Sequence, residues 1–356
     1  MALWPTELTA QGISDYTILT FDLQAMNTDH WDMVGHDWAV RALRRAVTAD
    51  NVSHAYLFTG PPGVGRTTLA RRLASALLCD QEDITARPCG DCRACRLIRS
   101  GTHPDLHIVE SEHPGASLKI DQVRQLEHTL SLTPVEGRRQ VAVLRRFEEA
   151  TASAANALLK TLEEPPSSAL LVVVAQEADV LLPTIVSRCQ HVPLRPLPVA
   201  TVKQALEEQW GATEEQAELL AHLSGGRLGW AVRTLEDAQG LARRARRLDD
   251  LAALIDGSIV ERFRYVERLA QDPVATQETL DLWLGWWRDV LLIACEADAV
   301  LTNVDRQDAV RGCARRFGVA VSAEIVGALR SAIEKLRQNA NPRLTLEVLM
   351  LDLPRA

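Results

Sequence analysis

The stretch GPPGVGRTT at residues 60–68 has the residue types and spacing of a loop that binds phosphate. Gly60, Gly63 and Gly65 let the backbone come close to an anion, because glycine has no side chain to block the approach. N–H groups of the loop and the N-terminus of a following helix would then supply partial positive charge. A glycine-rich turn without a ligand is the alternative, but the flanking apolar run and helical pattern favour the phosphate loop.

The lysine position of this loop holds Arg66. In the signature G-x-x-x-x-G-K-[ST], the lysine reaches the β- and γ-phosphates and the hydroxyl residue binds magnesium. Thr67 keeps the hydroxyl, and Thr68 follows it. A guanidinium is wider and planar, so it does not simply replace an ammonium. We therefore expect Arg66, Thr67 and Thr68 to face a nucleotide that this chain binds weakly or not at all, and hydrolyses poorly.

Acidic residues are displaced from the place where a nucleotide hydrolase needs them. One acid holds magnesium and another orients water, at the end of the strand that pairs with the phosphate-loop strand. We expect that strand at 141–144, yet Arg145 and Arg146 follow it. Glu148 and Glu149 come next and could be a shifted acid pair. We favour solvated charges at a helix start, where they suit the helix dipole.

Four cysteines follow the predicted loop helix with the spacing C-x9-C-x2-C-x2-C: Cys79, Cys89, Cys92 and Cys95. Zinc takes four thiolates in tetrahedral geometry, and closely spaced cysteines supply them from tight turns. The pattern predicts a closed structural zinc site, although Cys79 could instead belong to the preceding helix. The isolated cysteines are expected to be packing residues: Cys189, Cys295 and Cys313.

Alternating strands and helices position these groups. The apolar pattern predicts strands at 55–58, 106–109, 140–144, 170–175 and 192–194, and helices at 67–79, 120–130 and 153–164. Such alternation predicts an α/β fold with a parallel sheet and its ligand at the carboxyl ends of the strands. Before the loop, a helix-like pattern places four apolar residues together: Val34, Trp38, Leu43 and Val47. This segment could lie over a nucleotide base, and ordinary helix packing is the equal alternative.

The rest of the chain is predicted to be helical. Helices are expected at 199–209 and 214–223, another opens after Gly225, and a final one runs from about Thr345 to Leu351. Three tryptophans lie close together on one of the later helices, and the middle one is off its apolar face: Trp283, Trp286 and Trp287. Trp286 must therefore pack elsewhere or mark a contact surface.

The composition is that of a globular, acidic chain. The 356 residues are 47% hydrophobic and 24% charged, with a net charge of −8, which argues against broad nucleic-acid binding. No apolar run reaches membrane-spanning length and the first residues do not form a secretory signal, so we expect a cytoplasmic protein without a membrane partner. Residues 1–30 have no clear period and are expected to be an N-terminal extension, with a disordered arm as one interpretation, and no function is assigned to them.

Four segments in this order resemble a known family: HAYLFTGPPGVGRTT, the cysteine cluster, NALLKTLEEPP at 156–166 and TIVSRCQ at 184–190. They are similar to the bacterial sliding-clamp loader subunits of the AAA+ class, the DNA polymerase III gamma/tau and delta-prime subunits. The resemblance covers about residues 31–356. Its motor branch keeps the lysine and an Asp-Glu pair, whereas Arg66 and Arg146-Phe147 stand at those places in this chain. The delta-prime branch of the family does not hydrolyse ATP, so the departure favours that branch.

The resemblance implies roles for two arginines. Arg188, in the Ser-Arg-Cys motif, would be an arginine finger that acts in trans at the ATP site of a gamma/tau neighbour. Arg227 would be a second sensor of nucleotide phosphates, with a helix-start arginine as the equal alternative. The implied partners are gamma/tau and delta subunits in a hetero-pentamer and, through it, the sliding clamp and primed DNA.

The resemblance also implies the domain organisation. We expect an AAA+ domain at 31–195 with a zinc module at 79–100, a helical lid at 196–245 and an all-α collar at 246–356. Two other functions stay open. A gamma/tau-type ATPase would use Arg66 in place of lysine and Glu148 or Glu149 as the acid. A zinc-dependent nucleic-acid-binding module with a vestigial loop is the third hypothesis.

Overall fold

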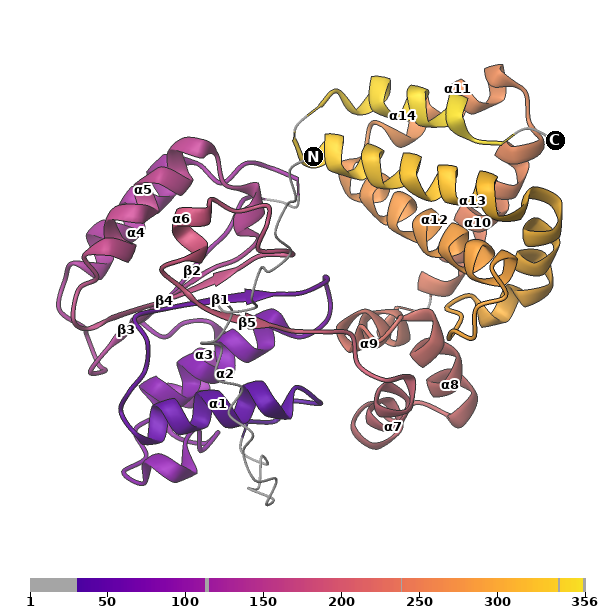
Figure 1. Cartoon of the computed structure of the whole chain (residues 1–356). Coiled ribbons are helices and arrows are strands. Elements are labelled where there is room, and N and C mark those ends of the chain that lie inside the picture. Colours follow the sequence, from indigo (N-terminus) through magenta and orange to yellow (C-terminus); the bar gives the residue numbers. More distant parts are fainter. Residues whose placement is uncertain (1–30, 113–114, 238, 339, 355–356) are drawn as a thin grey trace, which may run out of the picture.

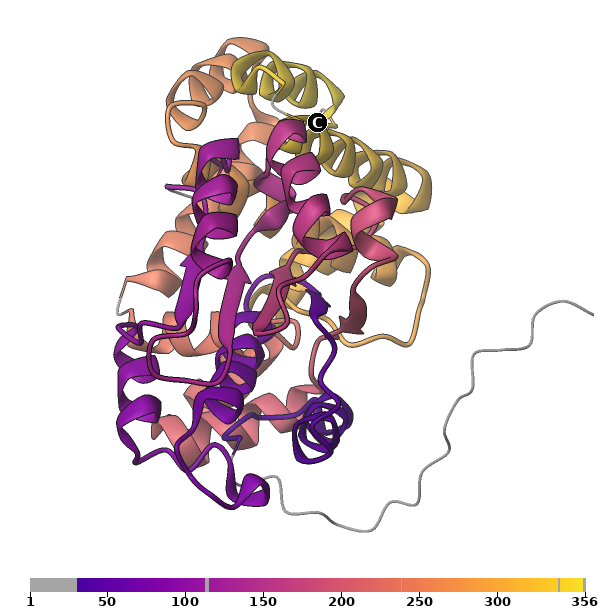
Figure 2. The ribbon, with the colours of Figure 1, turned by 90° about the vertical axis from the view of Figure 1, so that its left-hand side faces the viewer.

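The structure is a computed structural model that describes residues 31–112, 115–237, 239–338 and 340–354. The expected extension at residues 1–30 lies outside the described residues. Within them, an α/β domain is followed by a small helical unit and then by a helical bundle (Figure 1). Figures 1 and 2 agree that the bundle helices α11 (Ile259–Leu269) and α14 (Pro342–Asp352) lie at the opposite end of the molecule from α1 (Asp37–Thr48).

Five parallel strands form the sheet in the order β2-β3-β4-β1-β5. Their bounds are Ala55–Thr59 for β1, Leu106–Val109 for β2, Gln140–Leu144 for β3, Ala169–Val174 for β4 and Gln190–Pro193 for β5. All residues of β1, β3 and β4 are buried, as expected for strands covered on both faces. The predicted α/β fold with a parallel sheet is therefore confirmed.

One prediction about this sheet is wrong. Strand β3 does not pair with β1, because β4 lies between them: Leu57 is opposite Val173 of β4, and Val143 of β3 is opposite Val172. The local sequence of a strand encodes its burial but not its neighbours, and all three strands are equally apolar. The arginines after β3 are therefore one strand further from the phosphate loop than expected.

Helices cover the two faces of the sheet (Figure 1). One core joins the sheet to α1, α2 (Arg66–Leu78) and α3 (Arg93–Ser100), and it includes Tyr56 and Phe58 of β1. The other core joins it to α4 (Ile120–Leu130), α5 (Ala152–Glu163) and α6 (Pro183–Val186), and it includes Leu57. This alternation follows because successive residues of a strand point to opposite faces.

Helix α1 buries two residues of the predicted pattern, Leu43 and Val47, but not Trp38. Its buried residues are Ala39, Val40, Leu43 and Val47. Trp38 is 48% exposed. In a helix the residues three and four apart share a face, so Ala39, Val40, Leu43 and Val47 form one buried stripe and Trp38 lies beside it. Val34 precedes the helix.

Three helices form the small unit that we call the lid: α7 (Val199–Trp210), α8 (Glu214–Leu223) and α9 (Leu228–Glu236). They share a core of their own that includes Val202, Leu206 and Leu220. Helix α10 (Gly240–Asp256) then runs across the expected boundary at residue 245 and contributes Leu248 to the next core.

The C-terminal bundle contains α10, α11, α12 (Pro273–Ala294), α13 (Gln307–Arg337) and α14 around one core. Trp283, Trp286 and Trp287 all belong to this core, and Trp286 is only 6% exposed. Trp286 therefore packs inside the bundle, which is one of the two predicted outcomes. Helix α13 is interrupted at Gly318, whose φ of 66° is left-handed.

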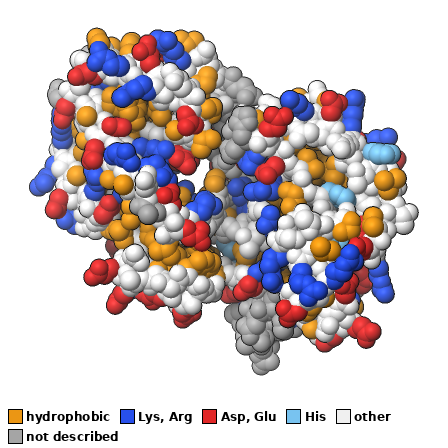
Figure 3. Space-filling model, turned by 180° about the vertical axis from the view of Figure 1, so that it is seen from behind, with side chains coloured by type: hydrophobic (Ala, Val, Ile, Leu, Met, Phe, Trp, Pro, Cys, Tyr) orange, Lys and Arg blue, Asp and Glu red, His pale blue; other side chains and the backbone are white. Residues whose placement is uncertain are grey.

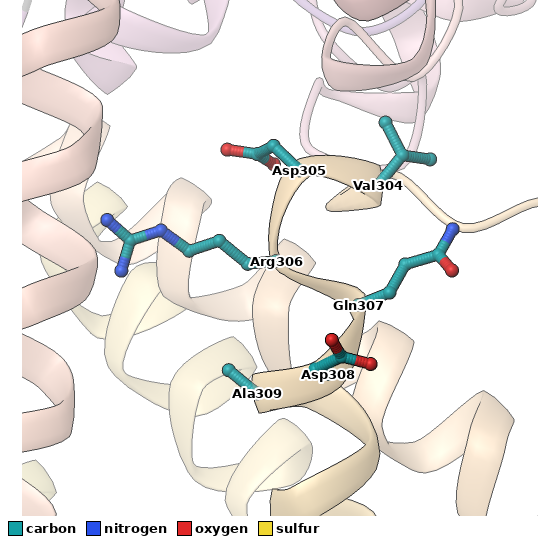
Figure 4. Close-up of a pocket in the computed structure, with 6 residues that line it drawn as sticks. All are labelled: Val304, Asp305, Arg306, Gln307, Asp308 and Ala309. Carbon is teal, nitrogen blue, oxygen red and sulfur yellow. The ribbon is translucent and has the colours of Figure 1, made fainter.

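A hollow of about 450 Å³ lies in the bundle where α13 begins, and it is lined by residues 304–309 (Figure 4). One of them, Arg306, turns toward α10, where it donates to Asp249 over 2.6 Å. Among the described residues, no helix is both long enough and apolar enough to cross a membrane.

Candidate functional site

The phosphate loop has the predicted context of strand, glycine turn and helix. It begins after β1, and α2 starts at Arg66. Gly60, Gly63 and Gly65 have φ values of 140°, 85° and 113°, which other residues rarely adopt. Gly60 also lies so close to β5 that a Cβ atom would stand 2.3 Å from the carbonyl oxygen of Leu194. The three glycines therefore have the conformational role that the sequence predicts.

Arg66 points into the protein toward Glu148. Burial lowers the pKa of Arg66, and the negative charge of Glu148 partly offsets this effect. Burial raises the pKa of Glu148, against the influence of its own backbone and of Arg66. Arg66 Nη1 and Glu148 Oε2 are buried without a hydrogen-bond partner among the described residues. A bound phosphate or an ordered water could accept from Arg66 Nη1, whereas Glu148 Oε2 needs a donor such as an ordered water.

The prediction that Glu148 and Glu149 are solvated charges is wrong. They lie on a short 3-10 helix, Phe147–Glu149, whose Phe147 is buried in the core below α5. Burying Phe147 draws the two carboxylates inward. Glu149 accepts hydrogen bonds from Ser111 Oγ, from the Gly115 N–H and from Arg146.

Arg146 stands at the carboxyl end of β3, in a left-handed conformation with φ of 50°. Its Nε donates to Glu149 and its Nη1 to Glu110, each over 2.9 Å, and its Nη2 donates to the carbonyl and hydroxyl oxygens of Ser111. Arg145 also donates to Glu110, over 3.2 Å. The Arg146 guanidinium thus pairs with Glu110, which follows β2, and with Glu149, which follows β3.

These groups fit a phosphate better than they fit magnesium. In such loops the backbone N–H groups donate hydrogen bonds to phosphate, and the hydroxyl at the position of Thr67 is a ligand of magnesium. Magnesium needs carboxylate oxygens, but Glu110, Glu148 and Glu149 each face an arginine in this structure. Thr67 is half-buried at the start of α2, whereas Thr68 is exposed.

The lid packs directly on the loop. The N–H of Gly229 donates to the carbonyl of Gly63 over 2.8 Å, and a Cβ on Gly63 would stand 3.0 Å from the nitrogen of Trp230. From the other side, a Cβ on Gly65 would stand 2.6 Å from Cε of Met33. A phosphate in this loop would therefore have to share its surroundings with α9 and with the segment before α1.

A hollow of about 320 Å³ lies beside the segment that precedes α1. Asp32, Met33 and Val34 line one side of it, and residues of α7 line the other. Asp32, Met33 and Val34 belong to the segment for which the sequence left two roles open, contact with a nucleotide base or ordinary packing. The hollow opens between the α/β domain and the lid, so both units would border such a base.

Arg227 lies at the start of α9, two residues before the glycine that touches the loop. Its Nε donates to the Ser224 carbonyl over 2.8 Å, and its guanidinium lies 5.9 Å from the Trp230 ring centre. Burial lowers the pKa of Arg227, with Asp281 acting in the opposite direction. Arg233, which the sequence reasoning missed, places Nη2 3.5 Å from the Cβ position of Gly63. Its helical spacing of four residues from Gly229 was the available sign.

The four cysteines come together as predicted. Their sulfur atoms all lie within 4.8 Å of one another. Cys79 Sγ is 3.6 Å from Cys89 Sγ and 3.8 Å from Cys92 Sγ, and tetrahedral zinc with bonds of about 2.3 Å needs sulfurs about 3.8 Å apart. Burial raises the pKa of Cys95 and of Cys79. Hydrogen bonds from the N–H groups of Cys92 and Asp91 overcome the effect of burial on Cys89 and lower its pKa to about 7.

This cysteine cluster brings the end of α2 next to the start of α3. Cys79 follows α2, and Cys92 is the N-cap of α3. Its donor set of four sulfurs fits zinc, with no position left for a reactive water. Of the other cysteines, Cys189 and Cys313 are half-buried, but Cys295 is exposed beyond the end of α12, so it is not the packing residue we expected.

Arg188 lies at the end of the sheet opposite to the phosphate loop. It precedes β5, whose first residue Gln190 is opposite Tyr56 near the start of β1. The loop begins at Gly60, after the other end of β1. Four residues of strand, about 13 Å at about 3.3 Å per residue, therefore lie between Tyr56 and the start of the loop. Arg188 pairs with Glu163 over 2.8 Å and donates to the Thr184 carbonyl over 3.0 Å. Any phosphate that Arg188 reaches must therefore belong to another molecule.

Comparison with known proteins relates this chain to DNA polymerase III subunits. The family model described as DNA polymerase III, delta subunit, matches residues 35–198. The DNA polymerase III subunit delta' of Bacillus subtilis is 31% identical over 324 residues, which cover 88% of this chain and 94% of that protein. The delta' subunit of Pseudomonas aeruginosa is 42% identical over 179 residues, 49% of this chain and 53% of that protein.

Other similar proteins carry the names gamma/tau or gamma. The DNA polymerase III subunit gamma/tau of Mycobacterium bovis is 29% identical over 347 residues, 89% of this chain and 59% of that protein. A solved structure of a gamma subunit-related protein from Thermotoga maritima covers 87% of this chain and 97% of its own, with 21% identity and a TM-score of 0.41. By its relation to the delta' subunits, this chain belongs to the delta-prime family of DNA polymerase III clamp-loader subunits.

Proposed function

We propose that this chain is a non-catalytic, stator-type subunit of the clamp loader that supplies Arg188 in trans to the ATP site of a gamma/tau neighbour. The observation that carries the proposal is the position of Arg188 at the amino end of β5, away from its own phosphate loop. A guanidinium at a γ-phosphate stabilises the charge of the transition state. From this edge of the sheet it serves a nucleotide bound by an adjacent subunit.

The state of its own loop supports a non-catalytic role. Arg66 replaces the lysine and is turned toward Glu148, and Arg146 neutralises Glu110 and Glu149. Hydrolysis requires one carboxylate for magnesium and another for the water, but Glu110 and Glu149 are held by Arg146, which leaves Glu148, itself next to Arg66. We infer that ATP and magnesium bind this subunit weakly or not at all, with Arg227 and Arg233 as the lid residues that would face a phosphate.

The remaining assignments rest on the family and on the arrangement of the chain. The cysteine cluster would hold one structural zinc, and the C-terminal bundle would be the collar that joins this subunit to gamma/tau and delta in a hetero-pentamer. That assembly would use ATP to place the sliding clamp on primed DNA. Acidic and basic side chains are interspersed on the face in Figure 3, which gives little support to a separate nucleic-acid-binding module.

One observation favours the competing function, an active gamma/tau-type ATPase. Glu148 lies next to Arg66 with a raised pKa, which is a property of general bases.

The two functions differ in steady-state ATP turnover by the purified chain with magnesium and primed DNA. We expect no turnover by the chain alone. We expect Arg188→Ala to lower the DNA-stimulated turnover of the assembled loader several-fold while assembly is unchanged. Turnover by the chain alone that Glu148→Gln abolishes would establish the ATPase instead.

A further inference from the structure

We propose that Glu163 is a positioning residue for Arg188: its carboxylate holds the guanidinium in the orientation in which it meets the neighbouring subunit's nucleotide. The inference rests on the proposed function of Arg188 in trans. It adds a second residue to that site, from a different element of the fold. Glu163 is the last residue of α5, whereas Arg188 follows α6.

Two contacts from two elements fix the guanidinium. Glu163 Oε1 lies 2.8 Å from Arg188 Nη2, and the carbonyl of Thr184 in α6 accepts from Arg188 Nη1 over 3.0 Å. One anchor alone would leave the planar group free to rotate, whereas an acceptor on each terminal nitrogen defines its plane. Arginine has five N–H donors, so three remain to meet a phosphate after these two contacts among the described residues.

The pair is built to orient the arginine and adds little to the fold. The Arg188 side chain is 35% exposed and that of Glu163 is 52% exposed. Exposed ion pairs contribute little to folding stability, so removing this one should leave the domain intact. A long arginine side chain without a partner samples many rotamers, and ordering it in advance lowers the entropy lost when it engages.

The negative charge of Glu163 requires that, in the proposed interface, Arg188 lies between Glu163 and the neighbour's nucleotide. A carboxylate next to a triphosphate repels it, so Glu163 is tolerated near the interface only while the guanidinium stands between the two anions. Contact with Glu163 on one nitrogen still leaves the outward N–H groups for the phosphate. The ion pair with Glu163 then holds the guanidinium in the position from which it stabilises the charge of the transition state.

The next residue provides a matched control. Glu164 follows Glu163 directly, is exposed, and ends α5 through its backbone N–H, which donates to Lys160 O over 3.0 Å. Glu164→Gln changes the same charge at the same helix end without touching the Arg188 pair. Any effect specific to Glu163→Gln therefore reports on the pair with Arg188.

The experiment is a double-mutant cycle in the full loader reconstituted with its gamma/tau neighbour. DNA-stimulated ATP turnover is measured for Glu163→Ala, Glu163→Gln, Arg188→Ala and the double variant Glu163→Ala/Arg188→Ala. We expect Glu163→Ala to lower kcat about three- to tenfold, with KM for ATP and the thermal unfolding midpoint of the subunit unchanged. In the Arg188→Ala background, Glu163→Ala should cause no further loss, and Glu164→Gln should behave as wild type.

Three results would overturn the inference. Normal kcat in Glu163→Ala, together with a slow Arg188→Ala loader, means that Arg188 needs no positioning by Glu163. An equal loss in both backgrounds means that Glu163 acts through the structure of α5. Normal turnover in Arg188→Ala overturns the proposed finger itself, and the positioning role falls with it.

Discussion

Arg146 and Glu149 form an ion pair of 2.9 Å where a clamp-loader motor would be expected to place its acidic pair. The same guanidinium contacts Glu110, so one arginine neutralises carboxylates from two sides. The Arg146 guanidinium therefore binds the carboxylates that would otherwise be candidate ligands of magnesium. In the proposed non-catalytic role, Arg66 and this ion pair would oppose hydrolysis separately, because Arg66 follows β1 and Arg146 follows β3.

Restoring the lysine alone should not create an ATPase. In Arg66→Lys the charge that reaches the β- and γ-phosphates returns, but Arg146 still neutralises Glu110 and Glu149. We expect steady-state ATP turnover by the variant to stay at the level of the wild-type chain. Arg71→Lys, on the exposed side of α2, is the control. Magnesium-dependent turnover by Arg66→Lys would contradict this interpretation of Arg146.

The cysteine cluster should make folding depend on a metal. Metal bound only by the folded state contributes its binding free energy to stability. We expect elemental analysis to find one zinc per chain, and a strong chelator or Cys92→Ser to lower the thermal unfolding midpoint by several degrees. Cys295→Ser, at an exposed cysteine outside the cluster, should leave both measurements unchanged. Less than one zinc per chain after gentle purification, or an unfolding midpoint that chelation does not move, would argue against the site.

His36 should make the stability of the phosphate-loop region depend on pH. Its Nε2 donates to the Val64 carbonyl of the loop over 3.1 Å, and burial lowers the pKa of His36 despite this bond and the charge of Asp37. The unfolded chain therefore takes up a proton first as pH falls below about 6.5. The stability contributed by neutral His36 is full above that pH and declines as pH falls toward the folded-state pKa.

This dependence can be measured by thermal unfolding at pH 7.5 and at pH 5. His36→Asn suits the left-handed conformation at this position, with φ of 57°, and removes the titrating group. We expect its unfolding midpoint to fall less between the two pH values than that of the wild type. His54→Asn changes an exposed histidine before β1, and its unfolding midpoint should fall as much as that of the wild type. Equal falls in all three proteins would rule out His36 as the source.

The sequence predicted those parts of the fold that depend on local burial. Helix α4 and strands β2 and β3 have the predicted bounds, because their apolar residues recur with the right period between clear breaks. The phosphate loop was recognisable because positive φ values demand glycine at fixed spacing. The cysteine cluster was recognisable because its ligands come from one short stretch of chain.

The features that were missed depend on contacts between distant parts of the chain. Glu148 looked solvated, but it is drawn inward because Phe147 fills the core below α5. The contact of Gly63 with Gly229 joins residues that are 166 positions apart, and no local pattern encodes it. Neither does local sequence encode the place of β4 between β1 and β3. Long-range packing decides which charges near the loop are free to act.

Arg262 should be essential for the stability of the C-terminal bundle. It is 1% exposed, and its guanidinium donates to carbonyl oxygens near the ends of α10 and α14, over 2.7–3.1 Å: those of Leu254, Ile255, Met350, Leu353 and Pro354. The last carbonyls of a helix have no partner within it and favour a positive charge. One buried cation therefore satisfies two helix ends and ties the C-terminus to α10.

Lysine cannot reproduce this arrangement, because its single ammonium has three donors and no planar fork. We expect Arg262→Lys to lower the free energy of unfolding by about 3 kcal/mol or more, since several buried carbonyls lose their donor. The exposed Arg264→Lys on the same helix should change it by less than about 0.5 kcal/mol. Urea unfolding monitored by tryptophan fluorescence measures both variants, because Trp283 and Trp287 lie in the core of the bundle. An Arg262→Lys variant as stable as Arg264→Lys would show that the bundle does not depend on this arginine to hold α10 and α14 together.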